Sequence, residues 1–202
     1  MARKLNFLFV GVVLSVGLLA CSRFASCAPP ERLACVDQDL SGADFSGADF
    51  GGTDLYNSDL SNANLTRADL SDVDLGGTNL TGADLSYANL RGATFGVTTI
   101  KGAGFFRADL TGAHLANTYL HKVAMTFANL TQADLSGAVL TDALLMNAYL
   151  MNANLTGADL TGAWLVRANL TGADLTGANL TDTHLEDAIL TGAIMPNGTI
   201  HE

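Results

Sequence analysis

The strongest feature of the sequence is a large apolar residue at every fifth position, from Leu40 to Met195. Across residues 36–195 this position is Leu in 25 of 32 pentapeptides, and the other seven carry Phe, Ile or Met. The residue two places earlier is small, with Ala in 23 pentapeptides. A period of five matches neither the 3.6-residue period of a helix nor the alternation of a strand. It predicts a coil that turns a corner every five residues, with the large and the small residue both facing a narrow core.

Two polar positions complete each pentapeptide. Asp or Asn precedes the large residue in 19 of the 32, and Gly, Asn or Asp follows two places after it in 24. Gly, Asn and Asp reach positive φ at low cost, so we place this later position at the corner. Four sides of five residues make a coil of 20, and the 32 pentapeptides therefore predict an all-β solenoid of eight coils.

Individual blocks resemble the pentapeptide-repeat family, whose motif is written A-(D/N)-L-x-x. Examples are Ala-Asp-Leu-Thr-Gly at 158–162 and again at 173–177, and the resemblance covers residues 38–195 without an insertion. It implies a right-handed quadrilateral β-helix, and it implies no enzyme, since activity is rarely demonstrated in the family. Residues 196–202 are expected to form a short tail. This tail or a second subunit must cover the open C-terminal end, and relatives that dimerise through that end make a homodimer one expected assembly.

The first residues predict an export signal. Arg3 and Lys4 precede an apolar run over residues 5–20, which is short for a membrane span. The run ends in Leu-Leu-Ala-Cys, which resembles the bacterial lipobox, whose cysteine is lipidated and becomes the new N-terminus. We predict a signal peptide over residues 1–20, lipid attachment at Cys21, and a linker or cap segment over residues 21–37. An ordinary signal peptide or an uncleaved anchor, with Cys21 incidental, is the alternative.

Two further cysteines, Cys27 and Cys35, stand close together in this segment. Outside the cytoplasm such a pair is most simply a disulfide, which would fasten the chain leading into the first coil. Free thiols are the alternative. The spacing differs from that of zinc-binding pairs and no histidine accompanies it, so we predict neither a metal site nor a cofactor.

The net charge of the chain argues against nucleic-acid binding, and the even distribution of its carboxylates argues against catalysis. With 20 acidic and 10 basic residues the net charge is -10, which opposes binding to nucleic-acid phosphates. Much of this acidity comes from the Asp that precedes the large residue. These carboxylates recur evenly along the rod and do not gather in a cleft, so we predict no catalytic residue and no enzymatic activity.

Departures from the repeat mark the candidate site. When positions are sorted by the 20-residue coil, one side obeys the Asp/Asn rule in the first three coils and breaks it in the next five. The predicted partner-binding residues on this side are Phe106, Arg107, Phe127, Leu144, Met146, Trp164, Val166 and Arg167. Exposed apolar surface containing Trp and Arg is typical of protein interfaces. Relaxed repeat sequence, or packing of the protein's own N-terminal segment here, is the alternative explanation.

The expected function is that of a non-enzymatic, exported lipoprotein, a scaffold or protein-interaction rod in the envelope. It would be held to the membrane by its lipid, face the periplasm or the cell exterior, and bind an unidentified protein or itself. Two alternatives come from the resemblance: a DNA-mimic protein that binds gyrase and confers quinolone resistance, and a thylakoid-lumen protein. The export signal opposes the first, because gyrase is cytoplasmic, and the lipobox opposes the second.

Overall fold

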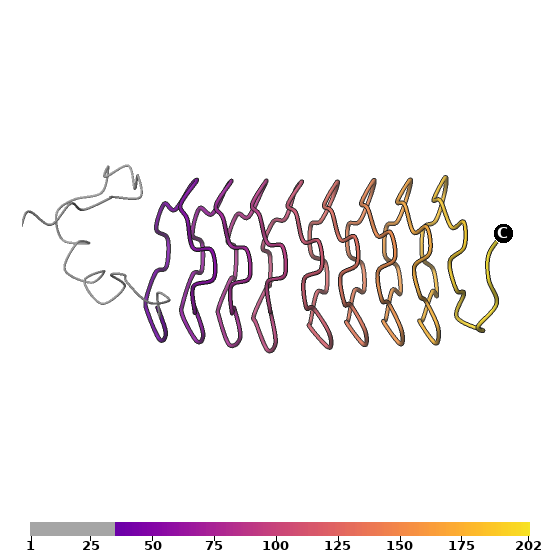
Figure 1. Cartoon of the computed structure of the whole chain (residues 1–202), viewed down its shortest axis with the longest axis horizontal. Helices are drawn as coiled ribbons and strands as arrows, with labels where there is room; N and C mark the ends of the chain where they lie inside the picture. The colour runs from indigo at the N-terminus through magenta and orange to yellow at the C-terminus, as the bar shows by residue number, and fades with distance from the viewer. Residues whose placement is uncertain (1–34) are drawn as a thin grey trace, which may run out of the picture.

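The computed structural model describes residues 35–202, which form a rod of stacked, four-sided coils (Figure 1). Each pentapeptide contributes a two-residue turn followed by one β-bridge residue, as at the turn 41–42 and the bridge residue Asp44. This alternation runs from residue 36 to residue 195, and the described chain contains no helix and no strand longer than a single bridge. The predicted export signal, Cys21 and Cys27 lie outside the described residues.

The bridges give the register of the coils. Those that join successive coils are parallel and connect residues twenty apart, as between Asp39 and Asp59 or between Trp164 and His184. Since a bridge residue recurs every five positions, each coil has the four sides that the period predicts. Backbone hydrogen bonds follow the same register, and the N–H of Leu130 donates to the carbonyl of Tyr149 at 2.7 Å. The coils are therefore joined side by side through their backbones.

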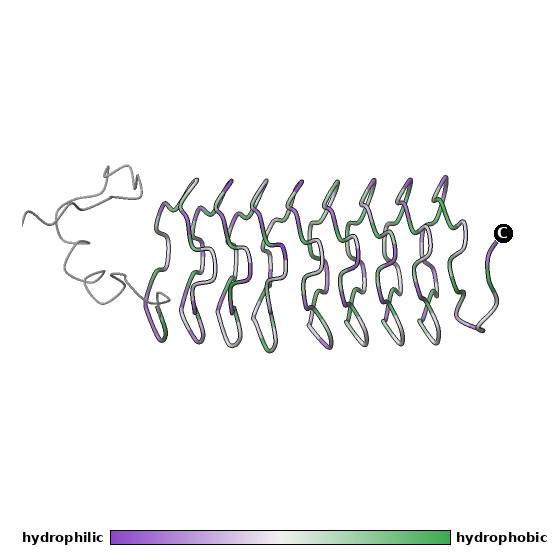
Figure 2. Ribbon diagram, viewed as in Figure 1, coloured by the Kyte–Doolittle hydropathy of each residue, from purple (hydrophilic) through white to green (hydrophobic). Residues whose placement is uncertain are grey.

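The core is a stack of the two inward positions. Leu130 and Ala128 are fully buried, as are nearly all their equivalents in the middle of the rod. Hydrophobic and hydrophilic segments consequently alternate along every coil (Figure 2). Burial of each Leu side chain contributes about 1.5–3 kcal/mol. At several inward positions a Thr or Ser replaces Ala and its hydroxyl bonds a neighbouring coil, as Thr78 does with the carbonyl of Leu55 at 2.8 Å.

The corners confirm the prediction of positive φ. The second residue of almost every turn is left-handed, from Gly42 at 62° to Gly192 at 71°, and even Phe127 adopts 60°. The corner at residues 96–97 differs, because Gly96 takes the positive φ, 48°, one place early. Val97 occupies the usual corner position, and a β-branched residue is strained at positive φ. The turn has shifted by one residue to avoid that strain.

Beside this corner the backbone pairing between two coils is interrupted. Facing segments 96–103 and 116–124 lack the bridge expected between Thr99 and Tyr119, although the same column is bridged before and after it. In other described coils the equivalent backbone amides donate to carbonyls of the next coil, as Asn117 does to Ser136. The amides of Val97, Ile100 and Gly102 have no such acceptor. Figure 1 shows the wider spacing of these two coils near the middle of the rod.

One buried hydroxyl also lacks its partner at the interrupted pairing between residues 96–103 and 116–124. Thr118 is buried, and its Oγ1 has no hydrogen-bond partner among the described residues. Its equivalent Thr78 donates to the carbonyl 23 residues earlier, which for Thr118 would be that of Phe95. That bond is absent, and the Phe95 carbonyl is contacted by the hydroxyl of Thr98, which also lies 2.6 Å from the Leu75 carbonyl.

The tail folds back over the end of the rod, which is one of the two outcomes left open by the sequence. Ile194 and Ile200 form an antiparallel bridge, and the His201 N–H donates to the Ala193 carbonyl at 2.8 Å. The cover is partial, because the amides of Leu180, Leu185 and Leu190 have no backbone acceptor among the described residues.

Candidate interaction surface

The predicted partner-binding residues lie along one side of the rod, which we call the aromatic side. Bridges link Gly104, Ala124, Leu144, Trp164 and His184 into one column, so the residues that break the Asp/Asn rule are direct neighbours. The exposed fractions are 37% for Phe106, Phe127 and Leu144 and 41% for Trp164. Arg107 and Arg167 are exposed, and Met146 and Val166 are half-buried.

The polar chemistry of an ordinary side explains why this one differs. The Asp84 carboxylate accepts the backbone N–H of Ser86 at 2.9 Å, and most Asp or Asn residues at this position cap the following turn in the same way. In the next coil Gly104 and Phe106 replace the carboxylate and the hydroxyl residue. The cap is lost there, and an aromatic ring takes its place on the surface.

Three rings form a continuous chain across successive coils. Tyr87 meets Phe106 edge to face at 5.6 Å and 80°, and Phe106 meets Phe127 at 5.9 Å and 82°. Each such contact contributes about 0.5–1.5 kcal/mol beyond area burial. The rings therefore hold one another in place, and this part of the aromatic side is preformed.

Arginines lie on the faces of these rings. The guanidinium of Arg107 is 5.5 Å from the ring centroid of Phe106 and 5.2 Å from that of Phe127, and Arg67 lies 5.7 Å above Tyr87. Cation–π contacts of this kind are worth about 0.5–1 kcal/mol at exposed sites. Neither arginine forms an ion pair with another described residue. Their positive charge is thus positioned but unneutralised.

The C-terminal part of the aromatic side is built differently. Trp164 stacks on His184 with centroids 4.1 Å apart and ring planes at 25°. Arg167 pairs with Asp187 at 3.5 Å, so its charge is partly neutralised. Tyr87 and His184 were outside the predicted set, although the 20-residue register together with their departure from the repeat would have found both.

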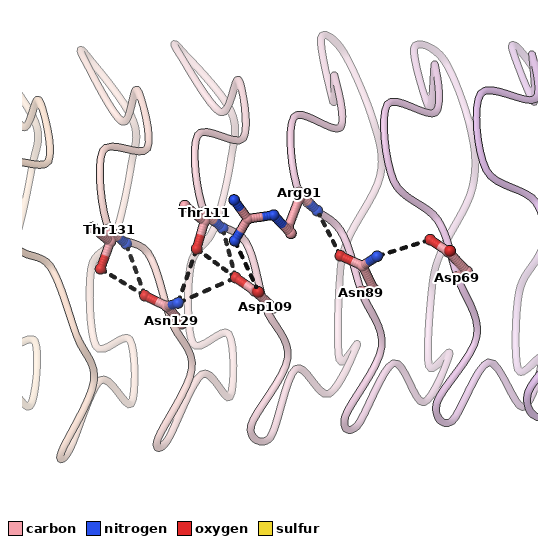
Figure 3. Close-up of polar contacts among 7 residues, drawn as sticks. All are labelled: Asp69, Asn89, Arg91, Asp109, Thr111, Asn129 and Thr131. Carbon is pink, nitrogen blue, oxygen red and sulfur yellow. Dashed lines mark hydrogen bonds and ion pairs between the residues drawn. The ribbon is translucent and has the colours of Figure 1, made fainter.

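The neighbouring side keeps the polar pattern from Asp49 to Asn129, part of which is shown in Figure 3, and departs from it at Tyr149 and Ile189. The Asn89 amide donates to Asp69 at 2.9 Å, and the Asn129 amide donates to Asp109 at 3.2 Å in the coils that follow. Arg91 also contacts Asp109 at 3.3 Å. Alternating Asp with Asn avoids the repulsion of stacked like charges.

Hydrogen bonds lower the pKa of several Asp carboxyls that precede the large residue of the repeat, which favours their charged form. The side-chain hydroxyl and then the backbone N–H of Thr161 lower the pKa of Asp159, and Thr176 does the same for Asp174. At Asp109 burial raises the pKa, but bonds from Thr111 and Arg91 outweigh it and the net shift is downward. These carboxylates cap turns, which is a structural task.

Three further properties concern residues 35–202. This part of the chain brings together no group of three His, Cys, Asp or Glu side chains that could hold a metal ion. None of its segments is a helix with the length and apolar character needed to cross a membrane. Cys35 is buried and disulfide-bonded. Its bonding partner lies outside the described residues, and the pairing with Cys27 stays a prediction.

Comparison with solved structures finds several pentapeptide-repeat proteins. HetL from the cyanobacterium Nostoc, involved in regulating heterocyst differentiation, is 33% identical over 83% of this chain and 91% of its own, with a TM-score of 0.31. QnrB1, a plasmid-mediated fluoroquinolone resistance protein, is 22% identical over 78% and 89%, with a TM-score of 0.46. A thylakoid-lumen protein from Arabidopsis thaliana is 30% identical over 73% and 72%, with a TM-score of 0.22. No curated protein matches the sequence.

The sequence profile of pentapeptide repeats matches most of the chain, over residues 39–77, 58–96, 103–142, 128–165 and 153–192. The matches leave out residues 97–102, which lie at the interruption between two coils. Pentapeptide repeats imply a right-handed quadrilateral β-helix, in agreement with the four sides seen here. Proteins built from them are typically non-enzymatic scaffolds. The sequence motif, the 20-residue register and the profile match agree, and the chain belongs to the pentapeptide-repeat family.

Proposed function

We propose that the protein is an exported, lipid-anchored scaffold whose aromatic side binds another protein of the cell envelope. The observation that carries this proposal is the chain of exposed rings formed by Tyr87, Phe106 and Phe127, with Arg107 on two of them. Aromatic residues and arginine are the usual anchors of protein interfaces. A preformed surface also reduces the entropy lost on binding.

The site supports binding without chemistry. The Asp residues of the repeat are distributed along the rod and are engaged as turn caps, as in the bonds from Thr161 to Asp159 and from Thr176 to Asp174. A general acid or base needs a free carboxyl facing a substrate cleft. The proposed function is therefore non-enzymatic.

Export is supported by the sequence of the first 21 residues, which combines a basic start, an apolar run and a lipobox-like end at Cys21. Lipidation there would place the rod in the periplasm or at the cell exterior. A disulfide between Cys27 and Cys35 is consistent with such a compartment.

The net charge of -10 favours a second candidate, a DNA-mimic protein that binds gyrase. Against it stand the export signal and the aromatic side, because a DNA mimic should present carboxylates where this rod presents rings and arginines. A thylakoid-lumen protein is a third candidate. Globomycin treatment followed by fractionation separates all three, since only the lipoprotein should accumulate as an unprocessed precursor.

The partner surface is tested by restoring the repeat residues. We would combine Phe106→Ser, Phe127→Gly and Trp164→Asn, each the type of residue that the repeat uses at that position, and capture cross-linked partners from membranes. Loss of capture with unchanged circular dichroism is expected. Tyr119→Asn, on another side of the rod, is the matched control and should capture normally. Full capture by the triple variant would rule out the aromatic side as the binding surface.

A further inference from the structure

A shallow depression of about 330 Å³ adjoins the aromatic side and spans three successive coils. Arg107 and Asp109 line it from the first of these coils, Phe127, Asn129 and Thr131 from the second, and Tyr149 and Met151 from the third. Tyr149 stands where most coils carry Asp or Asn, and Met151 where most carry Thr or Ser. Two departures from the repeat in one coil therefore contribute to the lining.

Few polar groups in the depression are free to bind a ligand. Asn129 is occupied, because its amide donates to Asp109 and Thr111 while its oxygen accepts from Thr131. The Asp109 carboxylate is held by Arg91, Thr111 and Asn129 (Figure 3). By contrast, the guanidinium of Arg107 has no ion pair among the described residues, and the Tyr149 hydroxyl has no hydrogen-bond partner among them.

The charges in the depression are not equally available. Asp109 is paired with Arg91 at 3.3 Å, which leaves Arg107 as the unpaired charge in a chain whose net charge is -10. The Arg107 guanidinium contacts both Phe106 and Phe127, at 5.5 and 5.2 Å from their ring centroids, and these two contacts restrain it. A fixed guanidinium recognises a carboxylate through paired N–H donors. Beside it, Phe127, Met151 and the half-exposed ring of Tyr149 offer an apolar contact.

We propose that this depression binds an extended acidic segment of the partner protein, one that carries a carboxylate next to an apolar side chain. The carboxylate accepts from Arg107 and Tyr149, and the apolar side chain packs against Met151 and Phe127. This inference rests on the proposed function, since it names the chemistry of the partner that the aromatic side would bind.

The test uses the full chain in detergent solution and a fluorescein-labelled decapeptide of alternating leucine and glutamate. Analogues with glutamine or lysine in place of glutamate provide the charge comparison, and binding is followed by fluorescence polarisation. We expect the glutamate peptide to bind at least about tenfold more tightly than either analogue, because a charge-assisted contact is lost in both.

The variant combines Tyr149→Asn with Met151→Thr, which restores two repeat residues and leaves the ring chain of the aromatic side intact. It should lose about tenfold in affinity for the glutamate peptide, as should Arg107→Gly. Tyr119→Asn makes the same exchange on another side and should bind normally. Equal affinity for the glutamate and glutamine peptides, or unchanged binding by the double variant, would overturn the proposal.

Vesicles of phosphatidylcholine with phosphatidylglycerol form a separate arm. The proposed lipid at Cys21 would itself hold the chain to any vesicle, so vesicles of phosphatidylcholine alone give the baseline. Co-sedimentation that increases with phosphatidylglycerol in the unaltered chain, but not in the variant with Tyr149→Asn and Met151→Thr, would show that the depression binds an anionic membrane, and would overturn the peptide proposal. If the glutamate peptide does not bind while membrane partners are still captured through Phe106 and Trp164, the acidic-segment proposal is wrong and the proposed function stands. Loss of capture in the aromatic-side variant remains the separate test of the proposed function.

Discussion

The shifted corner at Gly96 and Val97 allows a stringent test of how the repeat is held together. At an ordinary corner such as residues 156–157 the second turn residue takes the positive φ, and the turn is bonded to the coils on both sides, from the Gly137 amide to the Thr156 carbonyl and from the Gly157 amide to the Thr176 carbonyl. The double change Gly96→Thr with Val97→Gly restores a Thr-Gly turn such as that at residues 156–157. It should move the positive φ back to position 97. A β-carbon at position 96 has room, because its nearest neighbour would be Gly76 Cα at 3.6 Å.

The magnitude follows from the contacts that the change creates. Two backbone hydrogen bonds should form, from the amide of Gly77 to the carbonyl of residue 96 and from the amide of residue 97 to the carbonyl of Ala116. Each contributes about 0.5–1.5 kcal/mol net, so the double variant should gain about 1–3 kcal/mol. Gly96→Thr alone leaves a β-branched residue at positive φ and should lose about 1–2 kcal/mol. The second substitution thus reverses the sign of the first.

Urea unfolding followed by far-ultraviolet circular dichroism measures these differences at constant m-value. Hydrogen exchange should also slow at residues 77 and 97 of the double variant, since both amides become bonded. The opposite exchange at an ordinary corner, Thr156→Gly with Gly157→Val, is the control and should destabilise the rod. A double variant as unstable as Gly96→Thr alone would refute the reasoning. The position of the positive φ would then not depend on which of the two turn residues is glycine.

Two further predictions concern single polar groups. Thr118→Val should stabilise the rod by about 1 kcal/mol because it removes a buried hydroxyl without a partner, whereas Thr78→Val should destabilise it by breaking the bond to the Leu55 carbonyl; equal effects on the urea midpoint would contradict both. Hydrogen bonds from Thr176 lower the pKa of Asp174, so its stabilising contribution is present above about pH 4 and is lost as the pH falls through the folded value. The melting temperature should fall below that pH, less steeply in Asp174→Asn, and equal slopes would argue against it.

The fold was predictable because its information is local and repeated. A large residue at every fifth position and a small one two places earlier specify which side chains face inward, as the burial of Leu130 and Ala128 confirms. The corner chemistry was predictable for the same reason, since Gly, Asn and Asp reach positive φ cheaply. The 20-residue register then brought Leu144, Trp164 and the other predicted residues to one side of the rod.

The contacts between coils were decided only by the tertiary structure. Whether two residues twenty apart touch depends on side-chain length and direction, which is why the edge-to-face rings and the position of Arg107 could not be derived from the pattern. The interruption near Val97 depends on which backbone groups face each other across two coils. The depression likewise depends on side chains from three successive coils, among them Phe127, Tyr149 and Met151, lying around one space. The sequence alone determines the inward side chains and the sides of the rod, and packing between coils determines its surface.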